Sequence, residues 1–598
     1  MTDRPVALDA PAWRRTRISP ATVVLLAGGL VGAVVVPFVP MQQYLISLLM
    51  QASTYAVAVL GLTICLGYAG QINLAQAAFF GIGAYSVGLG TAGFGLPFWL
   101  ALAIGVGVAA IAGMALGLAS LRVGGHYLAM VTISFQTILS LVLINWVSFT
   151  HGPDGVPNIG RPVAFGYVFD DGAYLSLSIL SLCVVSLFVL LLPNTRLGRA
   201  MQALRDNELA AGVVGVDTYR TKVIAFALSS FFGGLGGGLF AGGFSYVSPD
   251  QFTFGESVVF LTMVLLGGVR SPFGAMLGTA LLILLPEWLR FLKVIYLAVY
   301  GAAVILIMVF MPDGIWGFVS TQWRKLRPPT PIEPGQIAPL PLVRQVARDV
   351  GRVVLATKDL SKHFGGLKAL EAVSFTVQSN DVHALIGPNG SGKTTLLNIL
   401  SGIYDPTRGG ITFDGRELVG LQPHQRAGLG LGRTFQNIRL FTAMTVLENV
   451  MVGAERPNHP PFGGEAQLEQ HALAALDFVG LARRGHEQVG SLSYGHQRLV
   501  EIARTLAGSP KFILLDEPGA GLNHVEKSEL VALLKRLKGH GLTILIIDHD
   551  MHLVEQIADR ITVLNFGRRI ADGLPADVLR NPDVIAAYLG EPTVHVAA

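Results

Sequence analysis

The sequence contains only two cysteines among 598 residues, Cys65 and Cys183, and both lie inside apolar runs. This scarcity supports neither a disulfide framework nor a cysteine metal site, and we expect both thiols to be packing residues. Charged residues are scarce as well, at 14% of the chain against about a quarter in ordinary soluble proteins. Because 52% of the residues are hydrophobic, the chain is too apolar to be soluble throughout, and a membrane portion is expected.

A strong charge of one sign is also missing. The formal net charge is +4, and the basic pI is better explained by Lys and Arg in loops beside a membrane than by a nucleic-acid surface. No nucleic-acid partner is expected. The length exceeds what one hydrophobic core supports, so the chain is predicted to contain several domains.

About ten apolar runs fill the first half of the chain, most of them near the roughly 20 residues that a bilayer requires. A polar segment precedes the first run, but no small-residue cleavage pattern follows it, which favours a retained membrane helix over a signal peptide. The run from Ser257 is short and is read as a possible broken or re-entrant helix, so the count is open by one or two. The runs are Thr22–Val39, Tyr44–Gly67, Leu74–Gly93, Phe98–Leu121, Tyr127–Phe149, Tyr174–Leu192, Val223–Phe244, Ser257–Gly268, Phe273–Leu289 and Phe291–Met311.

Basic residues follow the loops that an even number of spans with an inside N-terminus would place in the cytoplasm. Arg161, Arg290 and Lys293 are exceptions on the outside. The longest outside segment, His151–Gly172, is either a docking surface or a solvated connector. The predicted inside residues are Arg14, Arg15, Arg17, Arg122, Arg196, Arg199, Arg205, Arg220, Lys222, Arg270, Arg324, Lys325 and Arg327.

Several polar residues interrupt the apolar runs, where they are costly unless they face a cavity or another helix. They are candidates for a translocation path, although hydrogen bonds between helices would explain them equally. The abundant glycines in the spans are expected to allow close helix packing. The polar candidates are Gln71, Asn73, Gln76, Thr132, Ser134, Gln136 and Thr137.

The inside segment from Pro193 to Thr221 has helical composition from Arg199 to Ala211 and predicts a surface helix ending near Gly212 or Gly215. Together with Gly67–Tyr85, its Asp206-Asn207-Glu208 sequence resembles the LivM-type permeases of branched-chain amino acid ABC importers, over roughly residues 20 to 320. In that family a cytoplasmic coupling helix seats in a groove of the ATPase. The resemblance implies this role for the segment from Arg205 to Gly215.

The predicted organisation is a polytopic all-α membrane domain of about ten helices followed by an α/β P-loop ATPase domain with a helical subdomain. A cytoplasmic tail spans residues 1–20 and the membrane domain 21–320. Residues 321–352 contain a proline-rich stretch without periodicity, which predicts a semi-stiff linker. From 353 to 598 the composition is that of a soluble α/β protein.

A glycine-rich stretch in the second half has the pattern of a phosphate-binding loop. A short apolar strand precedes it and a helix follows, so backbone N–H groups would converge on an anion at a helix N-terminus. Lys393 is expected to reach the outer phosphates of ATP, and the Thr394 hydroxyl to bind Mg²⁺. The loop residues are Gly387, Pro388, Asn389, Gly390, Ser391, Gly392, Lys393, Thr394 and Thr395.

An apolar strand from Phe512 to Leu515 leads into Asp516 and Glu517, the pattern of a Walker B motif. Asp516 is predicted to hold Mg²⁺. Glu517 is predicted to act as general base on the water that attacks the γ-phosphate.

These motifs occur in the order found in ABC-type ATPases, and the resemblance covers roughly residues 353 to 590. It implies that Phe364 stacks on adenine, that Gln436 is the Q-loop residue touching Mg²⁺ and the attacking water, and that His549 is the switch histidine sensing the γ-phosphate. The D-loop matches Gly519–Asn523, but Asn523 stands where the family more often has Asp, which leaves its contacts open.

The sequence Leu492–Arg498 resembles the ABC signature, with His496 in the place of the usual glutamine. Ser493 and the Gly495 backbone at a helix N-terminus provide donors for a γ-phosphate. In the family, ATP binds between two such domains, so this signature would serve the nucleotide of a partner domain. If the last position needs glutamine, one of the two composite sites is weakened.

The resemblance implies a fused permease and ATPase of an ABC importer that uses ATP and Mg²⁺ to move a small polar solute, branched-chain or related amino acids, into a bacterium. Urea, short amides and aromatic carboxylates are alternative solutes, and a membrane-anchored ATPase that transmits a signal is the alternative of another class. Expected partners are membrane lipid, LivH-like and LivF-like subunits or a second copy of this chain, and a periplasmic binding protein. The expected location is the inner membrane, with the N-terminus and the ATPase domain cytoplasmic.

Overall fold

The computed structural model describes residues 20–35, 41–119, 126–164, 166–288, 295–311, 313–326, 337, 340, 351–455 and 464–589. The predicted tail up to residue 19, Arg122, Arg290, Lys293 and most of the predicted linker lie outside these residues. Two compact units form. Unit 1 comprises residues 1–67, 72–191 and 223–322, and unit 2 comprises residues 68–71, 192–222 and 323–598.

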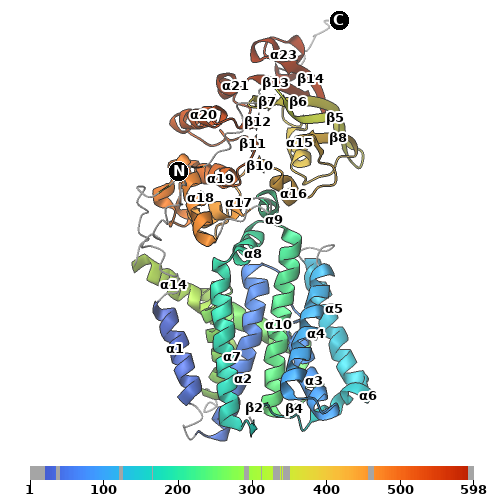
Figure 1. Ribbon diagram of the computed structural model, residues 1–598, viewed down its shortest axis with the longest axis vertical. Helices are drawn as coiled ribbons and strands as arrows, with labels where there is room; N and C mark the ends of the chain where they lie inside the picture. The colour runs from blue at the N-terminus through green and yellow to red at the C-terminus, as the bar shows by residue number, and fades with distance from the viewer. Residues whose placement is uncertain are drawn as a thin grey trace, which may run out of the picture. The chain divides into compact units, whose positions relative to one another are not determined.

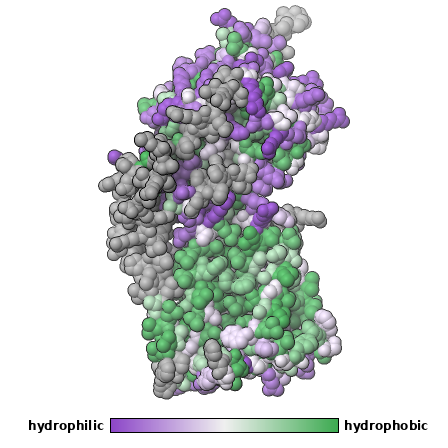
Figure 2. Space-filling model, viewed as in Figure 1, coloured by the Kyte–Doolittle hydropathy of each residue, from purple (hydrophilic) through white to green (hydrophobic). Residues whose placement is uncertain are grey.

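Unit 1 is a bundle of apolar helices, and Figure 2 shows hydrophobic residues over much of the described surface on the face in view. Each of the ten predicted runs contains a helix in the described part of the chain (Figure 1). The helices are α1 (Pro20–Val35), α2 (Gln43–Leu62), α3 (Gln76–Gly88), α4 (Phe98–Ala119), α5 (His126–Asn145), α6 (Val147–Thr150), α7 (Asp171–Leu191), α10 (Thr218–Phe244), α11 (Phe254–Gly267), α12 (Pro272–Trp288), α13 (Tyr296–Phe310) and α14 (Gly314–Leu326).

Five helical spans in the described residues are long and apolar enough to cross a membrane, and a sixth arises if α13 and α14, bent by 43°, form one span. The others are shorter. The run from Ser257 forms one unbroken helix of 14 residues, α11. The run from Tyr127 divides at Trp146, because its backbone leaves the helical region there.

Helices α3 and α10 pack at backbone contact, as small residues permit in an apolar environment. A Cβ atom on Gly83 would lie 1.9 Å from the Gly234 carbonyl oxygen, and one on Gly237 would lie 1.8 Å from the Phe80 carbonyl oxygen. These glycines are therefore packing positions. Two short antiparallel strand pairs complete the described part of unit 1: β1 (Val156–Pro157) with β4 (Tyr246–Val247), and β2 (Val163–Ala164) with β3 (Tyr167–Val168).

The described residues of unit 2 form two sheets. The central one has the order β10-β11-β12-β7-β13-β14, parallel except for the last pair. The other is antiparallel, with the order β6-β5-β8-β9. The strands are β5 (Val353–Phe364), β6 (Leu367–Gln378), β7 (Val382–Ile386), β8 (Arg408–Phe413), β9 (Arg416–Glu417), β10 (Leu431–Arg433), β11 (Phe512–Asp516), β12 (Thr543–Ile547), β13 (Arg560–Asn565) and β14 (Arg568–Gly573).

Strands β7, β11 and β12 are buried along their whole length, as continuous apolar strands of a parallel sheet should be. Helices cover the sheet and form the predicted helical subdomain around α17 to α19. The helices are α8 (Arg196–Asp206), α9 (Glu208–Val213), α15 (Lys393–Leu400), α16 (Pro423–Gly428), α17 (Val446–Ala454), α18 (Glu465–Phe478), α19 (Tyr494–Ala507), α20 (His524–Gly539), α21 (Met551–Ile557), α22 (Pro575–Val578) and α23 (Pro582–Leu589). The predicted fold class is confirmed.

Candidate functional site

The phosphate-loop sequence connects β7 to α15, as predicted, and close contacts fix two of its glycines. Gly387 and Gly392 have φ angles of 149° and 99°. A Cβ atom would lie 2.1 Å from the Leu564 carbonyl oxygen at the first position and 2.6 Å from the Ala369 carbonyl oxygen at the second. Only glycine satisfies both the backbone conformation and the space.

Lys393 begins α15 and folds back over the loop. Its ammonium donates to the carbonyl oxygens of Gly387 (2.7 Å) and Pro388 (2.9 Å). Partial burial lowers the pKa of Lys393, and the nearby carboxylates of Glu517 and Asp516 oppose this shift. A cation held at the mouth of a loop of backbone N–H groups suits a polyphosphate.

The loop and the neighbouring acids also fit Mg²⁺. This ion takes oxygen ligands, usually one or two from the protein and the rest from phosphates and water. Thr394 is exposed in the first turn of α15 and Asp516 ends β11. The described residues contain no group of three or more His, Cys, Asp or Glu side chains that could form an all-protein cage.

Three predicted residues from different parts of the chain meet at one carboxylate. The Gln436 side-chain amide donates to Glu517 Oε2 at 3.0 Å, and His549 Nδ1 lies 3.6 Å from the same oxygen. Glu517 has a φ of 45°, unusual for a residue with a side chain. Its N–H donates to the Ile547 carbonyl at 2.8 Å, which holds that conformation.

The sheet order explains why these groups meet. Strands β11, β12 and β7 are adjacent and parallel, so their carboxyl ends lie at one edge of the sheet. Glu517 follows β11, His549 follows β12, and Gly387 follows β7. Ligands of open α/β sheets bind outside this edge.

Asp516 is buried, with 2% of its surface exposed. Burial raises the pKa of its carboxyl group, and Arg433, 3.6 Å away, opposes the shift. Phe364 lies at the end of β5 and is 41% exposed. Its ring packs edge-on against Tyr404, at 5.4 Å between centroids, and the Lys362 ammonium lies 5.1 Å from its centre.

The signature residues lie at the N-terminus of α19. Ser493 caps this helix, and His496 Nδ1 lies 2.8 Å from the Ser493 hydroxyl oxygen and 3.2 Å from Arg484 Nη1. A Cβ atom on Gly495 would lie 2.4 Å from Glu526 Oε1, the end of a flexible side chain.

Asn523 has a structural explanation. It is the N-cap of α20, and its side-chain oxygen accepts the Glu526 N–H at 3.0 Å while Glu526 accepts the Asn523 N–H at 3.0 Å. Asn and Asp cap helices about equally well. The departure from Asp therefore preserves the helix start.

Two sets of contacts at the site could not be predicted from the sequence. Arg498 on α19 is buried and donates to the carbonyl oxygens of Phe435 (2.6 Å) and Gln436 (2.7 Å), and it pairs with buried Glu501 at 2.8 Å. This arginine therefore ties the glutamine segment to the signature helix. Far along the chain, the Tyr588 hydroxyl accepts the Gly387 N–H at 2.7 Å.

The predicted surface helix from Arg199 to Ala211 is wrong in one respect, since it is two helices. The chain bends at Asn207, which has φ −158° and ψ 103°. Its side-chain oxygen accepts the Ala210 N–H at 2.9 Å and caps α9. Asn competes with the backbone for hydrogen bonds in this way and so starts a new helix.

The segment of α8 and α9 is docked on the ATPase part of unit 2. Apolar side chains of the segment share one buried cluster with Phe435, Phe441, Met444 and Val452. The Asp206 carboxylate accepts the Ala443 N–H at 2.8 Å, and Arg439 donates to Asn207 Oδ1 at 3.3 Å. Because Phe435 precedes Gln436, this docking surface is next to the glutamine of the site.

An ion cluster centred on buried Arg199 holds the other end of the segment. Arg199 is 4% exposed; its Nε lies 2.5 Å from Glu455 Oε1 and its Nη2 lies 2.9 Å from Glu465 Oε2. Burial raises the pKa of Glu455 to about 7, and Arg199 opposes that shift.

In unit 1, two of the polar path candidates are occupied by contacts between helices. Gln76 donates to the Ala58 carbonyl at 2.7 Å, and Gln136 donates to the Phe252 carbonyl at 2.8 Å and accepts the Ala78 N–H at 2.6 Å. Both are fully buried, which favours the packing interpretation. Ser134 and Thr137, in contrast, are exposed on α5.

Known families match both halves of the chain. Residues 44–311 match "Branched-chain amino acid transport system / permease component", residues 370–520 match "ABC transporter", and residues 568–593 match "Branched-chain amino acid ATP-binding cassette transporter". The last range includes Tyr588.

Individual relatives match the second half. The high-affinity branched-chain amino acid transport ATP-binding protein BraF of Pseudomonas aeruginosa is 43% identical over 40% of this chain and 100% of its own length. The corresponding LivG protein of Escherichia coli K12 is 42% identical over 40% of this chain and 98% of its own length. A solved nucleotide-free ATP-binding cassette from an ABC transporter is 34% identical over 40% of this chain and 100% of its own, with a TM-score of 0.38.

Proposed function

Because the chain belongs to the branched-chain amino acid ABC transporter family and joins a permease domain to an ABC ATPase domain, we propose that it imports branched-chain amino acids. The ATPase domain binds ATP, and hydrolysis of this ATP is coupled to transport. The observation that carries the proposal is the docking of the α8 and α9 segment next to Gln436, which joins the ATP site to the permease sequence.

In the proposed mechanism the loop from Gly387 to Thr395 holds the phosphates of ATP, with Lys393 supplying positive charge. Mg²⁺, held by Thr394, Asp516 and Gln436, would neutralise developing charge on the phosphates. Glu517 acts as general base on the attacking water. The Gln436 and His549 contacts to Glu517 aim its carboxylate.

Ser493 and Gly495 serve the nucleotide of a second ATPase domain, and Phe364 supports the adenine ring. The exposed ring of Phe364 and the exposed start of α19 are compatible with these roles. The second domain belongs to a LivF-like subunit or a second copy of this chain, and the second permease is LivH-like in the first case. A periplasmic binding protein delivers the solute.

The proposed domains are a cytoplasmic tail at 1–20, a membrane domain at 21–320, a linker at 321–352 and an ATPase domain at 353–598. The membrane is the bacterial inner membrane, with the tail and the ATPase domain in the cytoplasm. This arrangement follows from the Lys and Arg of the inside loops. The α8 and α9 segment then transmits closure of the ATPase pair to the permease.

Reconstituted vesicles containing the assembled transporter test the function. ATP-dependent leucine uptake that requires a leucine-loaded binding protein supports the importer. Uptake of urea, an amide or an aromatic carboxylate without uptake of leucine would show that the proposed solute is wrong and the importer function is right. Hydrolysis that no loaded binding protein changes, without any uptake, would favour a signalling ATPase.

Two substitutions test the site roles in the same vesicles. Lys393→Ala should lose most nucleotide affinity, because it removes the cation of the phosphate loop. Glu517→Gln should keep ATP binding and lose hydrolysis, because only the base is removed. Equal residual turnover of the two variants would contradict these roles.

A further inference from the structure

Two residues of unit 1 mark the middle of its membrane spans. Tyr55 lies at the midpoint of the span Gln43–Tyr68, and Gln136 lies at the midpoint of the span Tyr127–Asn145. A helix rises about 1.5 Å per residue, so both residues are about half a bilayer thickness from the ends of their spans. Groups that contact Tyr55 or Gln136 therefore lie near the middle of the membrane.

Helix α11 begins at this depth. Its Ser257 hydroxyl donates to Gln136 Oε1 at 3.0 Å, and the Phe252 carbonyl oxygen, just before the helix, accepts the Gln136 amide at 2.8 Å. The Phe260 ring of α11 packs on the Tyr55 ring at 5.0 Å between centroids. Helices that begin inside the membrane commonly contribute to the substrate site of a transporter.

Glu256 is an acid in the first turn of this helix. Phe260 lies one turn further along the same face, and the Tyr55 hydroxyl approaches the Glu256 carboxylate as a hydrogen-bond donor. Glu256 is partly exposed, and within the described residues it forms no ion pair. A carboxylate without a cation is costly at this depth, and the positive end of the helix dipole offsets only part of that cost. Such acids usually face a substrate path or a charged partner.

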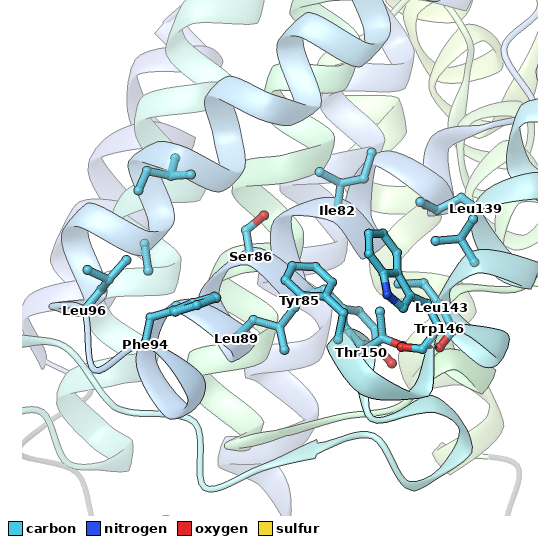
Figure 3. Close-up of a pocket in the computed structure, with 15 residues that line it drawn as sticks. Ile82, Tyr85, Ser86, Leu89, Phe94, Leu96, Leu139, Leu143, Trp146 and Thr150 are labelled. Atoms are coloured by element: carbon cyan, nitrogen blue, oxygen red, sulfur yellow. Dashed lines mark hydrogen bonds between the residues drawn. The ribbon is translucent and has the colours of Figure 1, made fainter.

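The apolar cavity of unit 1 does not supply a charged group. This cavity of about 400 Å³ lies between α3, α4 and α5, and Figure 3 shows Tyr85, Phe94 and Trp146 among the side chains that line it. None of its lining residues is charged, and neither Tyr55 nor Glu256 is among them. The Glu256 carboxylate is therefore the better candidate for recognising a cationic group.

We infer that Glu256 binds the α-ammonium group of the amino acid as it passes the middle of the membrane, with the Tyr55 hydroxyl orienting the carboxylate. The inference rests on the proposed importer function, because amino acids of this class all carry that cation. Two other roles for Glu256 compete with it. One is a structural hydrogen bond to Tyr55, and the other is an ion pair with a basic residue of a second permease.

The first test separates charge from hydrogen bonding in the assembled transporter in vesicles. Glu256→Gln keeps an acceptor for Tyr55 but removes the charge, so initial leucine uptake from saturating loaded binding protein should fall at least about tenfold. Glu256→Asp keeps the charge and should retain more uptake than Glu256→Gln. ATP hydrolysis should change less than uptake, because its residues lie in unit 2.

Glu287→Gln is the matched control. The Glu287 carboxylate accepts the Tyr44 hydroxyl at 2.6 Å, but Tyr44 lies at the start of α2 rather than at its middle. This variant loses the same charge from the same kind of pair, and its leucine uptake should stay within about twofold of the unsubstituted transporter.

The second test restores the charge chemically. Glu256→Cys should lose uptake, and a thiol reagent that adds a sulfonate should raise it at least about threefold, whereas one that adds an ammonium should not. The unsubstituted chain, treated in the same way, gives the background from Cys65 and Cys183. A sulfonate does not take up a proton at neutral pH, so recovery would also exclude a proton relay at this position.

Each result supports or overturns the inference. Near-normal uptake by Glu256→Gln would overturn it and leave a structural bond to Tyr55. Loss of the second permease from the purified Glu256→Gln transporter would reveal an ion pair between subunits and overturn it as well. So would a lack of recovery in sulfonate-labelled Glu256→Cys. Absence of leucine uptake by the unsubstituted transporter would refute the proposed function, whereas normal uptake by both the unsubstituted transporter and Glu256→Gln would refute this inference alone.

Discussion

Removing Arg199 should uncouple the two activities of this protein. Arg199 pairs with Glu455, and both side chains are 5% exposed. Breaking a buried ion pair by removing one partner costs about 3–5 kcal/mol, since the remaining charge is left buried. Arg199→Ala should therefore weaken docking of the α8 and α9 segment while leaving the ATP site intact.

The size of the defect should depend on pH. Burial already raises the pKa of Glu455 from 4.5 to about 7, so in the docked state this residue holds a proton more tightly than when exposed. The contribution of Glu455 to the stability of docking then falls as pH rises from 4.5 to about 7 and is constant above that pH. Without Arg199 the pKa of Glu455 in the docked state is higher still. The stability of docking therefore keeps falling above pH 7, by about 1.4 kcal/mol per pH unit.

Uptake and ATP hydrolysis are measured in vesicles at pH 6.5 and 8.5. Arg199→Ala should reduce leucine uptake at least about tenfold at pH 8.5, since each 1.4 kcal/mol is tenfold, and less at pH 6.5. Hydrolysis should change little.

The control is Lys222→Ala at the start of α10, which contacts the same segment through Glu208. Lys222 pairs with Glu208, which is 51% exposed, and such pairs contribute about 0–1 kcal/mol. The double variant Arg199→Met with Glu455→Met should recover uptake, because an apolar pair carries no buried charge. The reasoning is refuted if Arg199→Ala behaves like Lys222→Ala at both pH values.

Three other substitutions address the ATP site. Gly387→Ala places a Cβ atom 2.1 Å from the Leu564 carbonyl, so nucleotide affinity in an equilibrium binding assay should fall at least about tenfold, and a change under about twofold would contradict the packing argument. Tyr588→Phe removes the acceptor of the Gly387 N–H, so the free energy of unfolding of the ATPase domain should fall by about 1–3 kcal/mol. Amide hydrogen exchange at Gly387 should become faster, and unchanged exchange would refute the contact. His496→Gln should raise ATP hydrolysis of the assembled transporter by up to about twofold if one of two sites is weakened, and an unchanged rate would show that His496, which binds Ser493, replaces glutamine fully.

Much of the fold was predictable because its signals are local. The apolar runs predicted a helix in each place, and the strand before Gly387 with the helix after it predicted the loop connection. The run from Tyr127 and the segment from Arg199 were predicted as single helices and are each two. A backbone break needs only one residue, such as Asn207, whose side chain competes for the N–H groups of the helix.

Contacts between distant residues were not predictable in the same way. Gln76 and Gln136 were equally compatible with a path and with packing, and only their burial and helix-to-helix hydrogen bonds decide between these. Arg199 was predicted only as an inside-loop residue at the start of a surface helix, and its burial against Glu455 depends on two segments that are far apart in the chain.

The family, the two halves and the residue types of the ATP site could be predicted before folding is considered, because motif order and hydrophobic runs are properties of the chain alone. Folding is needed to bring Gln436, Glu517 and His549 together. It also places the Tyr588 hydroxyl where it accepts the Gly387 N–H. The physical reason is the order of parallel strands, β11-β12-β7, which brings separate carboxyl ends to one edge of the sheet.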